Sequence, residues 1–321
     1  MNVLITAAGR RVSLLQAFIA AAHRRGGRVV AGDVDALAPA LYVADEAVQI
    51  RRAADSDYIS GLLEIVARYE IALVVPTIDT DLEVLAAAQP DFAALGCRVA
   101  VSSASFVATN ADKYDAGVAF ANAGIAVPRM WLPPIGNPGE LPEFVFVKPR
   151  RGSASKDVHR IGRQELDAVL PSVPGPVVQE ELVGPEITID ALLDFGGRPI
   201  HFVPRVRIRT LAGESIQGRT LDHDDAFETW IERILGACSE MGASGPLTLQ
   251  AFQTDRGPVL SEINPRFGGG FPLGLAAGAS YPEWLLDMLA GVEVRPRLRD
   301  YETGLYMTRY HVEHLTRALK W

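Results

Sequence analysis

The chain has 321 residues, of which 48% are hydrophobic and 22% charged, enough for one large domain or two to three small ones with a substantial core. The net charge of -8 argues against sequence-independent binding of nucleic acid, which needs an excess of Lys and Arg. No stretch reaches the apolar length of a membrane-spanning helix, so no membrane partner is expected. Cys97 and Cys238 lie too far apart to indicate a disulfide framework or a metal site, which favours a reducing, cytoplasmic location.

The first hundred residues alternate between strand and helix patterns. Short apolar runs indicate buried strands, and apolar residues at helical spacing indicate amphipathic helices between them. The strands are expected at residues 3–7, 28–32 and 71–75, and the helices at residues 13–25 and 58–69. This order predicts an α/β domain over residues 1–108, with a mostly parallel sheet that binds ligands at the carboxyl ends of its strands.

The middle of the chain follows a different pattern. A helix is expected over residues 111–123, with Thr109 or Asn110 as its cap. Short strands then dominate from residue 144 to about residue 264, and one helix at residues 224–241 interrupts them. This combination is typical of an α+β segment with antiparallel pairs.

Two strands around the turn at residues 255–257 carry a set of oxygen donors. Alternation places Glu262 and Asn264 on one face of the second strand, and a three-residue loop at the turn places Gln250 opposite Glu262. Carboxylate and amide oxygens bind hard cations such as Mg²⁺, so this hairpin is a candidate metal site. Arg266 follows, where it can stabilise charge on a transferring phosphoryl group. The alternative is a hairpin with a polar, solvent-facing side.

A second segment combines a strand with a loop of small residues. The strand ends at Lys148, and the following loop contains Ser153, Ser155 and Lys156. Small residues let backbone N–H groups approach phosphate oxygens, and a lysine adds a compact positive charge. Only four of the 31 basic residues are lysine, and three of those four fall in the middle third of the chain, which favours a specific use. The alternative is an ordinary turn after a strand.

Two further strands carry polar faces. Glu186 and Asp190 share one strand face, and an acidic residue at the start of a strand can accept hydrogen bonds from ribose hydroxyls; the alternative is a solvated sheet edge. Arg205, Arg207 and Arg209 share a face of another strand, an arrangement suited to bidentate capture of a carboxylate or phosphate. The alternative for the arginines is a solvated charged face.

Taken together and in this order, these segments resemble the ATP-grasp superfamily, and most of all its carbamoyl phosphate synthase large-subunit type, as a stand-alone member. The matching motifs are a first-lysine helix start at residues 110–114, a second-lysine strand at residues 146–149, an adenine hinge at residues 179–186, and a metal strand at residues 262–266 with Gln250 opposite it. The resemblance implies an N-terminal parallel-sheet pre-ATP-grasp domain at residues 1–108, followed by a two-subdomain ATP-grasp fold at residues 109–175 and 176–321.

The resemblance also implies a function and the residues that perform it. The implied enzyme uses ATP with Mg²⁺ or Mn²⁺ to activate a small-molecule carboxylate as an acyl phosphate and joins it to an amine or a thiol, releasing ADP and phosphate. A loop at residues 150–157 would close as a lid. The residues implied to bind ATP are Lys113, Lys148, Ser153, Ser155, Lys156, Gln179, Glu180, Leu182 and Glu186, with Glu180 and Leu182 acting through their backbone. The metal ligands are Gln250, Glu262 and Asn264, and the catalytic residues are Arg266 and Lys148.

Two other functions stay open. A non-catalytic ATP-binding or regulatory module would share the nucleotide site without the reaction. A nicotinamide-dependent oxidoreductase is suggested by Asp33 at the end of the second strand, although the turn at residues 7–12 lacks the Gly-x-Gly-x-x-Gly spacing that lets a backbone approach a pyrophosphate. The loop at residues 211–218 is expected to fold over the acceptor substrate, and a homodimer is compatible with the sequence.

Overall fold

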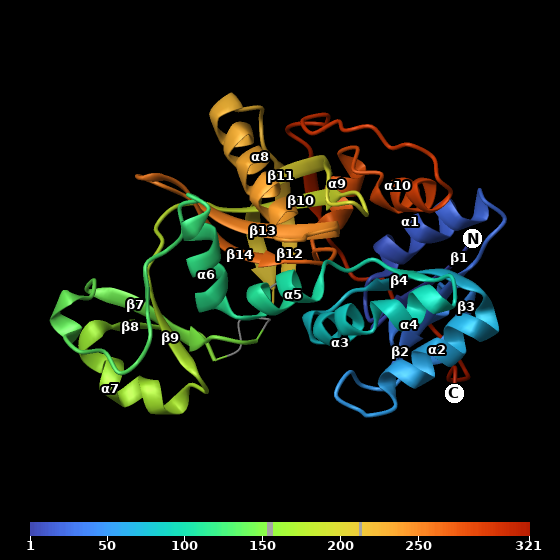
Figure 1. The fold of residues 1–321 in the computed structure, drawn as a ribbon, viewed down its shortest axis with the longest axis horizontal. Coiled ribbons are helices and arrows are strands. Elements are labelled where there is room, and N and C mark those ends of the chain that lie inside the picture. The colour runs from blue at the N-terminus through green and yellow to red at the C-terminus, as the bar shows by residue number, and fades with distance from the viewer. Residues whose placement is uncertain (153–156, 212–213) are drawn as a thin grey trace.

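The computed structural model describes residues 1–152, 157–211 and 214–321, and in them the chain forms three sheets. Figure 1 shows the N-terminal sheet at one end of the molecule, a small sheet at the other end, and a large sheet crossed by α8 between them. The expected fold class, an α/β domain followed by a two-subdomain α+β unit, is confirmed. No helix in the described parts of the chain is both long and apolar enough to cross a membrane.

The N-terminal sheet is parallel throughout, in the order β3-β2-β1-β4-β5. Alternate residues of β1 enter different cores: Val3 and Ile5 share a cluster with α1, whereas Leu4 shares one with α2. Helices therefore cover both faces, which leaves the carboxyl ends of the strands as the place where polar groups gather. The elements are β1 (Asn2–Thr6), α1 (Val12–His23), β2 (Val29–Asp33), η1 (Pro39–Tyr42), β3 (Glu46–Gln49), α2 (Tyr58–Tyr69), β4 (Ile71–Pro76), η2 (Asp79–Asp81), α3 (Leu82–Ala87), α4 (Gln89–Ala94) and β5 (Arg98–Val99).

The small sheet is antiparallel, in the order β6-β9-β7-β8. One of its faces packs on a separate core that contains Val145, Val147 and Val178. Because neighbouring residues alternate between faces, Lys148 and Gln179 lie on the opposite face from this core. The elements are β6 (Met130–Trp131), η3 (Pro138–Glu140), β7 (Phe144–Pro149), β8 (His159–Gly162), η4 (Arg163–Glu165), α7 (Leu166–Val169), η5 (Leu170–Ser172) and β9 (Pro176–Glu180).

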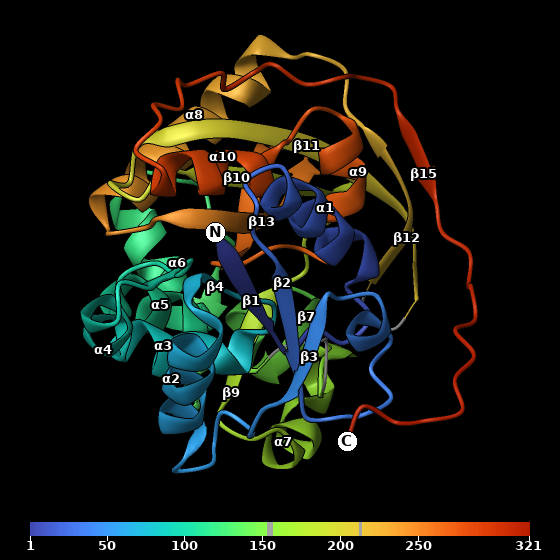
Figure 2. The same cartoon turned by 90° about the vertical axis from the view of Figure 1, so that its right-hand side faces the viewer.

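The large sheet is also antiparallel, in the order β14-β13-β10-β11-β12-β15. Ile189, Leu249 and Ile263 form a row on one face and share a core with Ile231 and Leu235 of α8. Figure 2 shows β15 beside β12 at the outer edge of this sheet. The elements are β10 (Glu186–Leu193), β11 (Pro199–Leu211), β12 (Glu214–Thr220), α8 (Asp225–Glu240), β13 (Gly245–Thr254), β14 (Gly257–Asn264), α9 (Phe271–Ala276), α10 (Tyr281–Leu289) and β15 (Tyr306–Thr308).

Two expectations about local structure are wrong. The helix expected at residues 111–123 is present as α6 (Lys113–Asn122), but its cap is Asp112 and not Thr109 or Asn110. Those two residues lie inside a preceding helix, α5 (Ala104–Ala111), which is capped by Ser103. Asp112 has an extended backbone, and its carboxylate accepts hydrogen bonds from the N–H groups of the two residues after Lys113, so it begins a new helix. Most of the loop expected at residues 211–218 is strand, because β12 pairs with β11 on one side and with β15 on the other.

Candidate active site

The β13–β14 hairpin places the expected oxygen donors opposite one another, by a route that differs from the prediction. Thr254 pairs with Gly257, so the loop has two residues rather than the expected three. A β-bulge at Ser261 then adds one residue to β14 and restores the register. Gln250 therefore pairs with Glu262, as predicted.

This pairing belongs to a polar face that runs across four strands of the large sheet. Glu262, Gln250, Thr188 and Arg205 are neighbours in register on β14, β13, β10 and β11, and Asn264 lies on the same face. Nowhere in the described residues do three His, Cys, Asp or Glu side chains gather into a metal-binding group. A metal at this hairpin would therefore rely on one carboxylate and two amide oxygens, a donor set that suits a hard cation also bound by phosphate oxygens.

The two lysines implied in phosphate binding lie near this face. Lys148 is the penultimate residue of β7, and only 9% of its surface is exposed. Lys113 begins α6, which packs against β14 around a small cavity lined by Gly117 and Glu262. Burial lowers the pKa of Lys148 to about 8, with Glu262 opposing the change and Lys113 adding to it. Two lysines and a carboxylate from three distant segments therefore interact electrostatically at one place.

The start of the predicted phosphate loop is attached to the N-terminus of α6. Lys113 donates its backbone N–H to the carbonyl of Arg150 at 3.0 Å, and its Nζ to the carbonyl of Gly152 at 2.7 Å. Arg150 Nη2 lies 2.8 Å from a carboxylate oxygen of Asp112. Burial alone would raise the pKa of Asp112, but the hydrogen bond from Arg150 lowers it overall. The remaining predicted loop residues, Ser153, Ser155 and Lys156, lie outside the described residues.

The hinge after β9 is held by its own acidic residue. The Glu180 carboxylate accepts hydrogen bonds from the N–H and Nε of Arg129, each at 3.0 Å, and from Arg256 Nη2 at 2.8 Å. Burial would raise the pKa of Glu180, but these arginines lower it overall. The Glu180 side chain therefore holds the hinge, and nucleotide contacts from the backbone of Glu180 and Leu182 stay a prediction. Gln179 is buried, and its Oε1 has no hydrogen-bond partner among the described residues.

The three arginines of β11 occupy different surroundings. Arg205 is 2% exposed, and its Nε donates to Asp190 Oδ2 at 2.8 Å within the sheet. Arg207 Nη1 lies 2.5 Å from Glu186, the residue implied in ribose binding, whereas Arg209 is exposed. A substrate role for these three side chains stays a prediction, and Arg205 already has a buried ionic partner.

Arg266 contacts a residue that sequence reasoning did not select. Its Nη2 donates to Asp79 Oδ2 at 3.0 Å, and its Nε lies 2.9 Å from Oδ1 without the alignment of a hydrogen bond. Asp79 belongs to η2, just after β4 of the N-terminal sheet. The signal that points to Asp79 is its type and place, since an acidic residue follows a buried parallel strand where ligands are bound.

Two family models match this chain. Residues 3–100 match the N-terminal domain of PylC-like proteins, and residues 172–311 match a family described as ATP-grasp in the biosynthetic pathway with Ter operon. The second match contains the hinge, the large sheet and the metal strand. The ATP-grasp match therefore covers the carboxyl-terminal part of the chain. The resemblance inferred from the sequence motifs is therefore confirmed.

Individual proteins resemble the chain as well. D-alanine–D-alanine ligase of Corynebacterium efficiens is 29% identical over 174 residues, which cover 45% of this chain and 47% of that protein. The chain thus matches less than half the length of this curated relative. Among solved structures, biotin carboxylase of Campylobacter jejuni has a TM-score of 0.77 at 15% identity, covering 95% of this chain and 74% of that one. L-amino acid ligase of Bacillus licheniformis has a TM-score of 0.69 at 18% identity, covering 92% and 77%.

The turn after β1 is closed by Asp33. The N–H groups of Gly9 and Asp35 donate to its two carboxylate oxygens at 2.7 and 2.9 Å. In a nicotinamide-dependent enzyme an acidic residue at this position binds a ribose hydroxyl. Because Asp33 instead holds the turn, the arrangement speaks against the oxidoreductase alternative.

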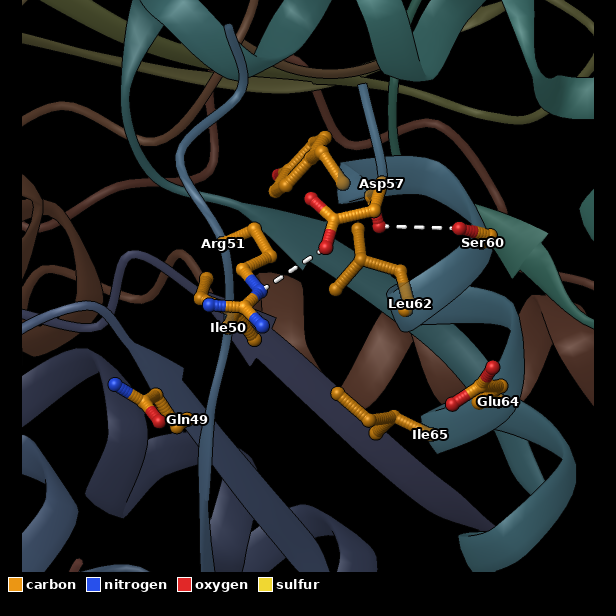
Figure 3. Close-up of a pocket in the computed structure, with 10 residues that line it drawn as sticks. Gln49, Ile50, Arg51, Asp57, Ser60, Leu62, Glu64 and Ile65 are labelled. Atoms are coloured by element: carbon orange, nitrogen blue, oxygen red, sulfur yellow. Dashed lines mark hydrogen bonds and ion pairs between the residues drawn. The ribbon is translucent and has the colours of Figure 1, made fainter. Parts of the chain in front are cut away.

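A separate cavity of about 260 Å³ lies in the pre-ATP-grasp domain, between the end of β3 and the start of α2 (Figure 3). Arg51 Nε lies 3.2 Å from Asp57 Oδ2, and both side chains are more than half exposed. Ser60 Oγ donates to the Asp57 carbonyl. None of the predicted site residues lines this cavity, so the candidate active site lies elsewhere.

Proposed function

We propose that the protein is an ATP-dependent ligase that joins a carboxylate to an amine, or to a thiol, through an acyl phosphate. The observation that carries this proposal is the convergence of Lys113, Lys148 and Glu262, which come from α6, β7 and β14 and interact electrostatically. A site that gathers two cations beside a carboxylate and amide oxygens is suited to a triphosphate with a divalent metal. The relatives named as ligases of D-alanine and of L-amino acids make amino acids the first substrates to test.

The donor set at the β13–β14 hairpin fits Mg²⁺ or Mn²⁺. Glu262 would provide the charged ligand, and Gln250 and Asn264 would provide amide oxygens from the same face of the sheet. When bound there, the metal neutralises negative charge on the nucleotide phosphates.

The chain's own residues account for the other requirements of the reaction. Lys113 and Lys148 hold the phosphate oxygens, and the hinge backbone at Glu180 and Leu182 orients the base. A carboxylate oxygen of the substrate forms a bond to the γ phosphorus as the bond to the ADP oxygen breaks, which gives the acyl phosphate and ADP. Arg266 stabilises the charge on the transferring phosphoryl group. The amine then bonds to the acyl carbon, phosphate departs with the carboxylate oxygen, and the amine loses a proton.

The test is release of ADP and phosphate from Mg-ATP across a panel of amino acids and other carboxylates, offered singly and in pairs with amines or thiols. Release that requires one particular carboxylate with one acceptor supports the ligase. Tight binding of Mg-ATP without release for any pair contradicts it and favours the non-catalytic ATP-binding module. Reduction of a nicotinamide cofactor would contradict both.

Two further properties of the ligase are part of the proposal. A cytoplasmic location is supported by Cys97 and Cys238, which are both free and buried, as suits a reducing compartment. A homodimer is compatible with this function, and light scattering during size-exclusion chromatography distinguishes it from a monomer.

A further inference from the structure

The Arg266–Asp79 ion pair joins two parts of the chain that are 187 residues apart in sequence. Arg266 ends the metal strand segment of the ATP-grasp unit, and Asp79 belongs to the pre-ATP-grasp domain. The Arg266 side chain is 14% exposed and the Asp79 side chain 27% exposed. The pair is therefore largely shielded from water, where an ionic contact is stronger than on an open surface.

Arg266 is held on several sides at once. Nη2 donates to Asp79 at 3.0 Å, and Nη1 donates to the carbonyl of Phe267 at 3.4 Å. The backbone is fixed as well, because the carbonyl of Arg266 accepts a hydrogen bond from Thr248 Oγ1 at 2.9 Å. A guanidinium has five N–H donors, so these contacts leave donors available for a ligand while they define the orientation of the plane.

We propose that Asp79 is a positioning residue for Arg266, through which the pre-ATP-grasp domain sets the geometry of phosphoryl transfer. The role rests on the proposed ligase function. Arg266 has several rotatable bonds, and Asp79 is the charged group that stops its guanidinium from turning away. Preorganised charge accelerates a reaction because it does not have to reorient as the transition state forms.

Asp79 is not needed to attach the two parts to each other. Arg25, which follows α1, has its Nη1 2.6 Å from Glu283 of α10, and Arg25 also pairs with Asp287. The rings of Phe18 and Phe267 pack edge to face with their centroids 5.8 Å apart. A conservative change at Asp79 should therefore leave the domains docked, and a change at Glu283 supplies a matched control that removes an interdomain ion pair away from Arg266.

The experiment compares Asp79→Asn, Asp79→Glu and Glu283→Gln with the wild-type protein in the carboxylate-dependent phosphate release assay. Asp79→Asn should lower kcat by about 10- to 100-fold, because a poorly placed charge costs about this much, while KM for ATP stays within about 2-fold. Asp79→Glu should recover part of the loss by restoring the charge. Glu283→Gln should keep kcat within about 2-fold, since it leaves Arg266 untouched.

A double-mutant cycle separates positioning from a general structural effect. In an Arg266→Lys background, Asp79→Asn should change kcat by less than about 2-fold, because the residue it orients is already gone. If the effects of the two substitutions on kcat multiply, the positioning role is overturned while the ligase function stands. The same holds if the Asp79→Asn variant is as active as the wild-type protein. A wild-type protein without carboxylate-dependent release would overturn the ligase function and this role with it.

Discussion

Lys148 should make nucleotide binding depend on pH. Lys148 is only 9% exposed, and burial lowers its pKa to about 8. The nearby Glu262 raises this pKa, whereas Lys113 lowers it further. A lysine is positively charged below its pKa and neutral above it, and only the ammonium form attracts phosphate oxygens. Affinity for Mg-ATP should therefore be close to its full value at pH 7 and below, and should fall as the pH rises through about 8.

The size of the effect follows from the fraction of Lys148 that carries a proton. With a pKa of about 8, roughly 90% of Lys148 is protonated at pH 7 and roughly 10% at pH 9. If only the protonated form binds, Kd at pH 9 is about tenfold higher than at pH 7, or about 1.4 kcal/mol weaker. Lys148→Arg is the matched control, because a guanidinium stays charged throughout this range and should keep Kd within about 2-fold.

Titration calorimetry with Mg²⁺ and a non-hydrolysable ATP analogue measures this directly at pH 7, 8 and 9. Repeating the pH 9 titration in buffers with different ionisation enthalpies counts the protons taken up, and the wild-type protein should approach one proton per nucleotide. Lys148→Arg should take up fewer. The same pH dependence and the same proton uptake in both proteins would refute the assignment to Lys148.

Three further changes test other parts of the site. Glu262→Ala should lower carboxylate-dependent ADP release by about 100-fold or more with little change in melting temperature, and retained turnover with full metal dependence would remove it from the metal ligands. Arg205→Ala should destabilise the protein by about 3–5 kcal/mol in denaturant unfolding, because it leaves the Asp190 charge buried alone; an unchanged stability with a raised KM for the carboxylate would instead support a substrate contact. Glu83→Gln removes the exposed pair with Arg151 and should cost less than about 1 kcal/mol by the same measurement, and a larger loss would contradict the weak contribution of exposed pairs.

The β13–β14 hairpin illustrates what periodicity in the sequence can predict. Alternation places Glu262 and Asn264 on one face, and the pairing of Gln250 with Glu262 is observed. The predicted loop length was wrong, and the register is right only because the bulge at Ser261 replaces the missing loop residue. A bulge leaves no mark in a pattern of alternating residues, so this compensation was not visible in the sequence.

Contacts between distant segments were harder to predict. Three arginines alternating on β11 suggested a common binding face, but the pairing of Arg205 with Asp190 depends on how β11 lies against β10. Asp79 was visible only as an acidic residue after a strand, and its contact with Arg266 requires the arrangement of two domains. Local motifs therefore predicted the elements and most of the candidate nucleotide site, whereas ion pairs across strands and domains needed the structure.

The central claim is that a carboxylate attacks ATP to form an acyl phosphate, and an isotope experiment tests it most directly. Once the panel assay identifies a substrate pair, the carboxylate is labelled with ¹⁸O and the released phosphate is analysed by mass spectrometry. The proposed mechanism predicts one ¹⁸O atom in each phosphate, because the carboxylate oxygen leaves with the phosphoryl group. Phosphate without the label would mean that water attacks ATP, which would contradict the acyl phosphate and the ligase function built on it.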